Sequence, residues 1–485
     1  MITTLLAASL MLSCNPKEIL EPTINYPTFV VIDGDTIKTR DDKGLINSVK
    51  VKNYGESRLV LGDTVVLYKN NNLPALPSKK ADLTKIKNSN DPELKDKPFR
   101  MVTVGGSLSA GVRDGGYTNE GMETSFPNLI ARQMGIEFNQ PLFDASDYNG
   151  FGKAVLTKRN ITGGPVPKFL EVSNNTAYSK RNSTGAYDLK SLKPGRIDNF
   201  SVKEIVFYDG SESKKGFSGY DASFYRLMNG HNEEKFGDLI IKEKFDFIIV
   251  CDVANVLNSK GSYQTIYDHC FPKGFEGYTN RITMSYPVEY SSRLNFFLNL
   301  KTKKDVKGVV FNTINTLKLP YFKWVSVESV NKEISKYNTK NVLKEAETIV
   351  PTGKIDSLLS PLVNMNLKPF INGEKYYGET NYFPLDSDDS YHLQGIIERN
   401  KETSSIAKSL GFAVVDIYSI YENIFNGQFV TFDGVTVNIS NFFSSDGINP
   451  GIFGQMVIAN ETIKVINQYY KTEIPYISTR EFLGK

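Results

Sequence analysis

From residue 99 onward, continuous apolar runs alternate with segments whose apolar residues recur at helical spacing. The runs are RMVTVGG (100–106), FDFIIVC (245–251), GVVFNTI (308–314) and FAVVDI (412–417), and segments 124–135, 390–411 and 453–470 have the helical pattern. Strands this apolar are buried on both faces, as in parallel sheets covered by helices. The alternation therefore predicts a three-layer α/β domain at residues 99–485, built as a doubly wound parallel sheet.

Composition excludes several classes of protein. Lys and Arg total 57 against 54 Asp and Glu, a net charge of +3, so no excess of cations favours a nucleic-acid partner. Hydrophobic residues make up 40% of the chain, which is enough for a sizeable core. With three cysteines and three histidines, we expect neither a disulfide scaffold nor a metal site, and we expect no cofactor.

The N-terminus predicts export. Residues 2–12 are apolar or small and uncharged, and they end at Ser13-Cys14. Such a run is too short to span a membrane, which takes about 20 residues, but it suits a signal peptide. A cysteine at this point resembles the lipobox of bacterial lipoproteins. The resemblance implies a signal peptide at 1–13, acylation of Cys14, and attachment by this lipid to the outer membrane or cell surface.

Residues 14–98 have a different texture from the domain that follows. Segments within 27–70 are rich in Val, Ile, Thr and Tyr and contain Asp-Gly and Gly-Asp turns, which predicts a small β module. Residues 71–98 are polar, charged and interrupted by proline, which predicts a linker. Inside the main domain, residues 155–240 are rich in Gly, Ser, Asn and Lys and are interpreted as an insertion.

Two segments have the residues expected of a catalytic site. In VTVGGSLSAG (102–111), Ser107 follows a buried strand on a glycine-flanked turn, which is a typical place for an exposed nucleophile. In SSDGINPGIFG (444–454), Asp446 lies three residues before Asn449 at the start of the last long predicted helix.

Together these segments resemble the SGNH (GDSL-type) hydrolase family, in particular its lipoprotein branch in Bacteroidetes-type bacteria. GGSLSAG is similar to the first family block, with Ser107 as nucleophile. LKPGRI (192–197) is similar to a V-P-G-A segment, which places Gly195 as an oxyanion-hole donor, and FDFIIVCDVANVL (245–257) stands where the third block belongs. SSDGINPG corresponds to the D-G-(I/V)-H-P block. The resemblance implies a flavodoxin-like fold and hydrolysis of esters.

The family mechanism requires a histidine base held by an aspartate, and oxyanion donors that include an asparagine side chain. Here Asn449 stands at the histidine position and Ala254 at the asparagine position. An amide does not titrate near neutral pH, so Asn449 could orient Ser107 but could not accept its proton. Shifting the third block would place Asn255 or Asn258 at the oxyanion instead. A substitute base would have to be Asp446 itself or one of His231, His269 and His392.

Loss of the histidine base costs a serine triad about 10⁶-fold in turnover, and loss of one oxyanion donor about 10²–10³-fold. The sequence therefore favours a catalytically impaired relative that binds an acylated glycan or lipid or takes part in a surface assembly. The alternative is an active serine esterase or lipase with Ser107 as nucleophile and an unusual base. Pairing of Cys251 with Cys270 and two buried thiols both remain open.

The lipid anchor generates a direct test. Labelled palmitate fed to producing cells is expected to enter the wild-type chain and to be absent from Cys14→Ala, because alanine has no thiol to carry the lipid. Incorporation into Cys14→Ala would contradict the assignment.

Overall fold

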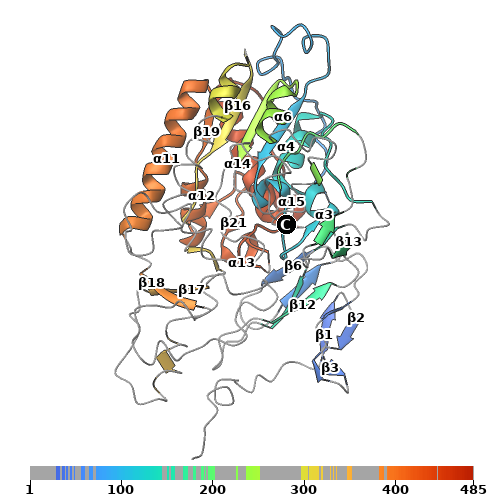
Figure 1. Cartoon of the computed structure of the whole chain (residues 1–485), viewed down its shortest axis with the longest axis vertical. Coiled ribbons are helices and arrows are strands. Elements are labelled where there is room, and N and C mark those ends of the chain that lie inside the picture. The colour runs from blue at the N-terminus through green and yellow to red at the C-terminus, as the bar shows by residue number, and fades with distance from the viewer. Residues whose placement is uncertain are drawn as a thin grey trace, which may run out of the picture.

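The computed structural model describes residues 73–144, 195–202, 236–251, 296–303, 305–315, 390–444 and 446–483, with short isolated pieces between residues 29 and 386. Strands and helices alternate along the chain in this part, which confirms the predicted α/β class (Figure 1). None of the described helices has both the length and the apolar composition required to cross a bilayer.

A parallel sheet forms the centre of the domain. Its strands lie in the spatial order β19-β16-β15-β8, and all three neighbouring pairs are parallel. They coincide with the four apolar runs of the sequence, and their bounds are Met101–Gly105 (β8), Phe247–Cys251 (β15), Lys307–Phe311 (β16) and Ala413–Val415 (β19). Every residue of β8 and β15 is buried, which explains why these runs lack polar alternation.

Residues 198–202 extend this sheet beyond β8. The Thr103 N–H donates to the Asp198 carbonyl at 2.8 Å, the Phe200 N–H to the Thr103 carbonyl at 2.7 Å, and the Val202 N–H to the Gly105 carbonyl at 3.1 Å. The pairing is parallel. If the five strands are numbered in chain order, their spatial order across the sheet is second, first, third, fourth and fifth. The direction in which the chain adds strands therefore reverses beside β8.

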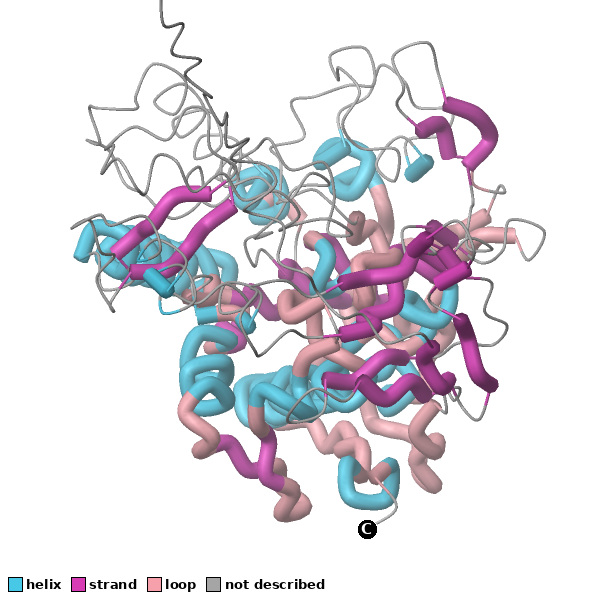
Figure 2. The backbone as a smooth tube through the Cα atoms, turned by 90° about the horizontal axis from the view of Figure 1, so that it is seen from below, coloured by secondary structure: helices cyan, strands magenta, loops and turns pink. Residues whose placement is uncertain are grey.

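Successive side chains of the strands point to opposite faces, and helices cover both (Figure 2). On one face Met101 and Phe247 pack with helices α4 (Phe126–Met134), α12 (Ile417–Phe425) and α14 (Ile452–Tyr470). On the other face Val102 and Ile248 pack with α6 (Phe236–Lys242) and α11 (Ser390–Leu410). The described residues thus form three layers.

Short elements surround these layers. The small helices are α2 (Ser107–Ala110), α3 (Asn119–Glu123), α13 (Ile439–Phe442) and α15 (Thr479–Phe482). The antiparallel pairs near or after the sheet are β9 (Tyr117–Thr118) with β10 (Gly150–Phe151), β17 (Glu347–Pro351) with β18 (Tyr382–Asp386), and β20 (Phe429–Val430) with β21 (Thr436–Val437).

The N-terminal region and the insertion are both built from short strands, and they share one sheet. Strand β5 pairs in parallel with β12, which pairs antiparallel with β11. The strands before residue 73 are β1 (Phe29–Ile32), β2 (Asp35–Lys38), β3 (Arg40–Asp41), β4 (Gly44–Leu45), β5 (Ser48–Val49), β6 (Glu56–Leu59) and β7 (Val65–Tyr68). Those of the insertion are β11 (Ala154–Lys158), β12 (Lys168–Val172), β13 (Tyr178–Arg181) and β14 (Tyr187–Leu189).

Residues 73–98 pack on the domain, so the predicted linker is corrected there. Leu83 and Ile86 belong to the core cluster that contains α4 and α14, and Ile86 is fully buried. Among the backbone contacts, the Pro74 carbonyl accepts a hydrogen bond from Arg132. The sequence hid this packing because the few apolar residues are separated by charged ones, leaving no clear period.

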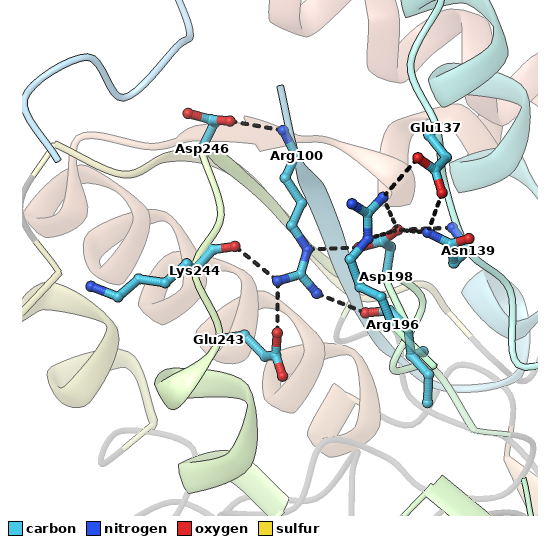
Figure 3. Close-up of polar contacts among 9 residues, drawn as sticks. Arg100, Glu137, Asn139, Arg196, Asp198, Glu243, Lys244 and Asp246 are labelled. Atoms are coloured by element: carbon cyan, nitrogen blue, oxygen red, sulfur yellow. Dashed lines mark hydrogen bonds and ion pairs between the residues drawn. The ribbon is translucent and has the colours of Figure 1, made fainter. Parts of the chain in front are cut away.

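Buried carboxylates hold the same segment at the amino-terminal edge of the sheet; Figure 3 shows two of them, Asp246 and Asp198, with Arg100 between them. Asp246, with no exposed surface, accepts hydrogen bonds from the N–H groups of Asn88 at 3.0 Å and Arg100 at 2.7 Å and pairs with the Lys87 ammonium at 3.2 Å. The Arg100 guanidinium in turn donates to Asp198 at 2.7 Å. Residues 73–98, β8, β15 and the 198–202 strand therefore meet in one network.

This packing predicts that Ile86→Ala destabilises the domain by about 2–5 kcal/mol, because a fully buried side chain leaves a cavity. The matched control is Leu76→Ala, whose side chain is 63% exposed and which we expect to change stability by no more than about 0.5 kcal/mol. Urea unfolding of both variants measures the difference. Equal, small effects would return residues 73–98 to the status of a linker.

Candidate functional site

Ser107 lies where β8 turns into helix α2, at the carboxyl end of the strand. Gly106 is the N-cap of α2 in an extended conformation, and the Ser107 side chain is partly exposed. The turn admits no side chain at Gly105, since a Cβ there would lie 2.4 Å from Ser109 Oγ and 2.5 Å from the Cys251 carbonyl oxygen. This strand–turn–helix arrangement presents the serine at the edge of the sheet, as predicted from the motif.

The carboxyl edge of the sheet, where Ser107 lies, is where ligands bind in doubly wound folds. β8 lies between β15 on one side and the 198–202 strand on the other, so the chain leaves β8 and β15 toward opposite sides of the sheet. Crevices form outside the carboxyl ends of strands at such a switch point. Ser107 follows β8 here, and Cys251, in register with Gly105, ends β15 as a fully buried thiol.

The loop with Asp446 and Asn449 is buried against the chain that follows Ser107. Asp446 is 1% exposed and Asn449 5%. Oδ1 of Asp446 accepts from the backbone N–H groups of Ile448 and Asn449, both at 2.9 Å. Oδ2 accepts from Asn449 Nδ2 at 2.9 Å and from the Gly115 N–H at 3.1 Å. Four donors thus occupy a carboxylate that offers about four acceptor positions.

A tight turn at residues 113–116 binds this loop through two hydrogen bonds, and we call this contact the clasp. Arg113 and Gly116 form an isolated antiparallel bridge, which makes Asp114 and Gly115 the two central residues of the turn. Their φ angles are +49° and +69°, the left-handed conformation for which Asp-Gly is a preferred pair. The central N–H groups point out of such a turn, and here the Asp114 N–H donates to Ser444 Oγ at 3.1 Å while Gly115 binds Asp446.

The surroundings of Asp446 favour the neutral form of its carboxyl group more than water does at an exposed carboxyl group. Burial raises the pKa of Asp446; hydrogen bonds from Asn449 and Ile448 oppose the rise, and the Asp114 carboxylate adds to it. Burial also raises the pKa of Tyr421 well above its ordinary value, and nearby Cys251 and Asp446 add to that shift. Cys251, at the carboxyl end of β15, and Asp446 thus act on the same tyrosine.

The geometry limits what Asp446 and Asn449 can do. Because hydrogen-bond donors surround both oxygens of Asp446, this carboxylate has no position left from which to accept the Ser107 proton. Asn449 donates its amide to Asp446 as a triad histidine would donate its ring N–H, but an amide cannot take up a proton. The pair therefore has the hydrogen bond of a histidine–aspartate pair but no group that can accept a proton at Asn449.

Of the predicted site residues, the structure brings Ser107, Asp446 and Asn449 to one side of the sheet and separates Gly195 from them. Gly195 is exposed and precedes the 198–202 strand, next to Arg196, which pairs with Asp198 at 3.1 Å in the amino-edge network (Figure 3). The prediction of Gly195 as an oxyanion donor is therefore corrected. The assignment came from the resemblance of LKPGRI to a V-P-G-A segment, and in the structure the strand at 198–202 begins only after this glycine.

The remaining predicted residues are not placed. Cys14, Ala254, Asn255, Asn258, His231, His269 and Cys270 lie outside the described residues. His392 lies on α11, and its side chain is outside the description as well. Among the described residues, no group of three or more His, Cys, Asp or Glu side chains could hold a metal ion.

Sequence reasoning missed the residues that hold the site together. Ser444, Asp114 and Gly115 make the clasp, and Gln455 in α14 reaches back to the carbonyl of Leu108 at 3.1 Å. The Asp114-Gly115 pair was a visible signal for a tight turn. Nothing in the sequence indicated which loop the turn would meet.

Comparison with known proteins adds no relative: no protein-family model matches the chain, and no curated protein matches it. The assignment of the site rests on the residue blocks, on the sheet and on the contacts described above.

Replacing Asp446 by Asn is expected to destabilise the protein by about 1–3 kcal/mol, because the introduced NH₂ group leaves at least one buried donor unsatisfied. Asp416→Asn is the matched control. Asp416 accepts three hydrogen bonds, from Ser419 N, Ser419 Oγ and Asn312 Nδ2, against the four of Asp446, but it is exposed, so water can replace a lost partner. Urea unfolding should show the larger loss for Asp446→Asn; the reverse order would contradict this account of the loop.

Proposed function

We propose that this protein is a lipid-anchored surface protein whose domain is a degenerate member of the SGNH hydrolase family. Its site would bind an acylated glycan or lipid, or serve a surface assembly, with little or no ester hydrolysis. The anchor is Cys14, and the proposal places the protein on the outer membrane or cell surface.

Two features support the family. The order of strands across the sheet, with the second strand outside the first, is the flavodoxin-like order that the family resemblance implies. The first and last blocks of the resemblance are also joined in space, through the contact of Gly115 with Asp446 and that of Gln455 with Leu108. Ser107 at the switch point is where a nucleophile of this family would lie.

The observation that carries the loss of catalysis is the Asp446–Asn449 pair. A serine nucleophile needs a neighbouring group that accepts its proton. Asn449 occupies the position of that group, with its amide nitrogen 2.9 Å from Asp446 Oδ2, and it does not titrate. Asp446 has its acceptor positions filled by other donors. A site of this kind can still bind the substrate class of its active relatives.

The second candidate is an active serine esterase whose base comes from outside the described residues. Ser107 favours it, because its side chain is partly exposed and lies on the tight glycine turn expected of a nucleophile. The two candidates differ in whether the wild-type serine is activated.

Labelling with a fluorophosphonate probe, together with hydrolysis of a short-chain nitrophenyl ester, separates them. We expect no labelling above background in the wild type and labelling of Ser107 in Asn449→His, because the imidazole would regain the hydrogen bond to Asp446 and could take up the proton. A positioned general base contributes about 10²–10⁴-fold, so the gain in rate should approach this range.

Two variants control the experiment. Asn449→His combined with Ser107→Ala must lose the gain, and Asn299→His, at an exposed position of the helical residues 296–301, must not produce it. Wild-type labelling that disappears in Ser107→Ala would overturn the proposal in favour of the active esterase. No labelling in any variant would count against Ser107 as the ancestral nucleophile.

A further inference from the structure

Gln455 joins the Ser107 turn to the start of helix α4. The residue lies in the first turn of α14 and is 1% exposed. Its Nε2 donates to the carbonyl of Leu108, the residue after Ser107, at 3.1 Å, and its Oε1 accepts from the N–H of Phe126 at 2.8 Å. One amide side chain thus makes a donor contact and an acceptor contact with backbone groups far away in the sequence.

Both backbone groups depend on this contact. Phe126 begins α4, and Ser125 does not cap the helix with its side chain, because its hydroxyl donates to the Met122 carbonyl at 2.7 Å. The Leu108 carbonyl belongs to a helix of a single turn, and its backbone contact, from Gly111, is long at 3.4 Å. A buried backbone group without a partner costs about 1–3 kcal/mol, so the Gln455 side chain is strongly held in place.

The start of α14 is itself fixed against α13. A Cβ on Gly454 would lie 2.3 Å from the Phe442 carbonyl oxygen, so the two backbones are in close contact. The Gly451 N–H donates to that same carbonyl at 2.9 Å, and the Ser444 N–H donates to the Asn449 carbonyl at 2.8 Å. The Asp446–Asn449 loop and the first turn of α14 therefore move as one unit, with Gln455 as its projecting end.

We propose that Gln455 is a positioning residue that sets where the Ser107 turn lies relative to the Asp446–Asn449 pair. It acts through Leu108 and the backbone of α2, not by contact with a ligand. The clasp at Gly115 fixes the far end of the segment after Ser107, and Gln455 fixes the near end. The catalytic importance of this contact rests on the proposed function. The effect of Gln455 on the position of the Ser107 turn does not, because it follows from the fold alone.

Hydrogen exchange of the full-length protein tests the coupling without any activity. The Val112 N–H donates to the Ser107 carbonyl at 3.0 Å and reports on the turn, although Gln455 does not touch it. We expect Gln455→Leu to speed exchange in peptides covering residues 107–116 by about tenfold or more, because the turn loses its anchor.

Asn460→Leu is a closely matched control. Asn460 lies on the same helix and is 5% exposed, and its side chain also bridges a carbonyl and an N–H, both of Ile477, at 2.9 and 2.8 Å. We expect it to lower stability to a similar extent and to speed exchange near Ile477, while residues 107–116 keep their protection. Equal loss of protection at 107–116 in both variants, or none in either, would overturn the proposal.

Gln455→Glu adds a second measurement, the pH dependence of exchange, which a residue that only fills space would not change. This variant also tests the proposal if Gln455→Leu does not fold. A protonated glutamic acid can donate to the Leu108 carbonyl and accept from Phe126, whereas the carboxylate can only accept. Burial raises the pKa of such a group, so protection at 107–116 should match the wild type at pH 5 and fall by about tenfold by pH 8. Protection that is the same at both pH values would contradict the donor role.

Fluorophosphonate labelling tests whether the contact of Gln455 with the Ser107 turn also affects the reactivity of Ser107. In the Asn449→His background, adding Gln455→Leu should slow fluorophosphonate labelling of Ser107 by about 10- to 100-fold, since small misplacements of reacting groups are costly. If Asn449→His never labels, the proposed function fails while the exchange experiment still decides the coupling. If it labels and Gln455→Leu changes neither labelling nor exchange, the positioning role fails alone.

Discussion

Hydrogen bonds between the last loop of the domain and the backbone after its first strand hold the candidate site together. The two N–H groups at the tip of the Asp114–Gly115 turn bind Ser444 and Asp446. Because the groups are buried, water cannot replace them, and the loop has one stable place to dock. The relation of Ser107 to Asp446 and Asn449 follows from this docking.

The amino-terminal and carboxyl edges of the sheet differ in the residues they carry. At the amino-terminal edge, Asp246, Arg100 and Asp198 form charged contacts that hold residues 73–98 and the outer strand to the domain (Figure 3). At the carboxyl edge, the switch in winding beside β8 leaves room for a crevice, and the glycine at 105 keeps the turn tight. The charged contacts that hold the outer segments thus lie at the opposite edge from Ser107.

Asn449 can supply the hydrogen bond of a triad histidine but not its chemistry. Its side-chain amide donates to Asp446 at 2.9 Å, so the buried carboxylate has a partner there. An amide cannot accept a proton, so this contact provides no base for a serine. If the proposed function holds, the fold and its buried network have outlasted the reaction.

The sequence by itself determined the strands of the sheet and the place of Ser107 directly after one of them. Runs such as VTVGG and FIIVC had to be buried strands because they are apolar on both faces, and Ser107 had to follow one of them. Only the tertiary structure decided that Gly195 lies at the opposite edge, that residues 73–98 belong to the domain, and that Gln455 reaches Leu108. Hydrophobic periodicity is a local property that the chain displays over a few residues, whereas these contacts join backbone groups separated by up to hundreds of residues and leave no periodic trace.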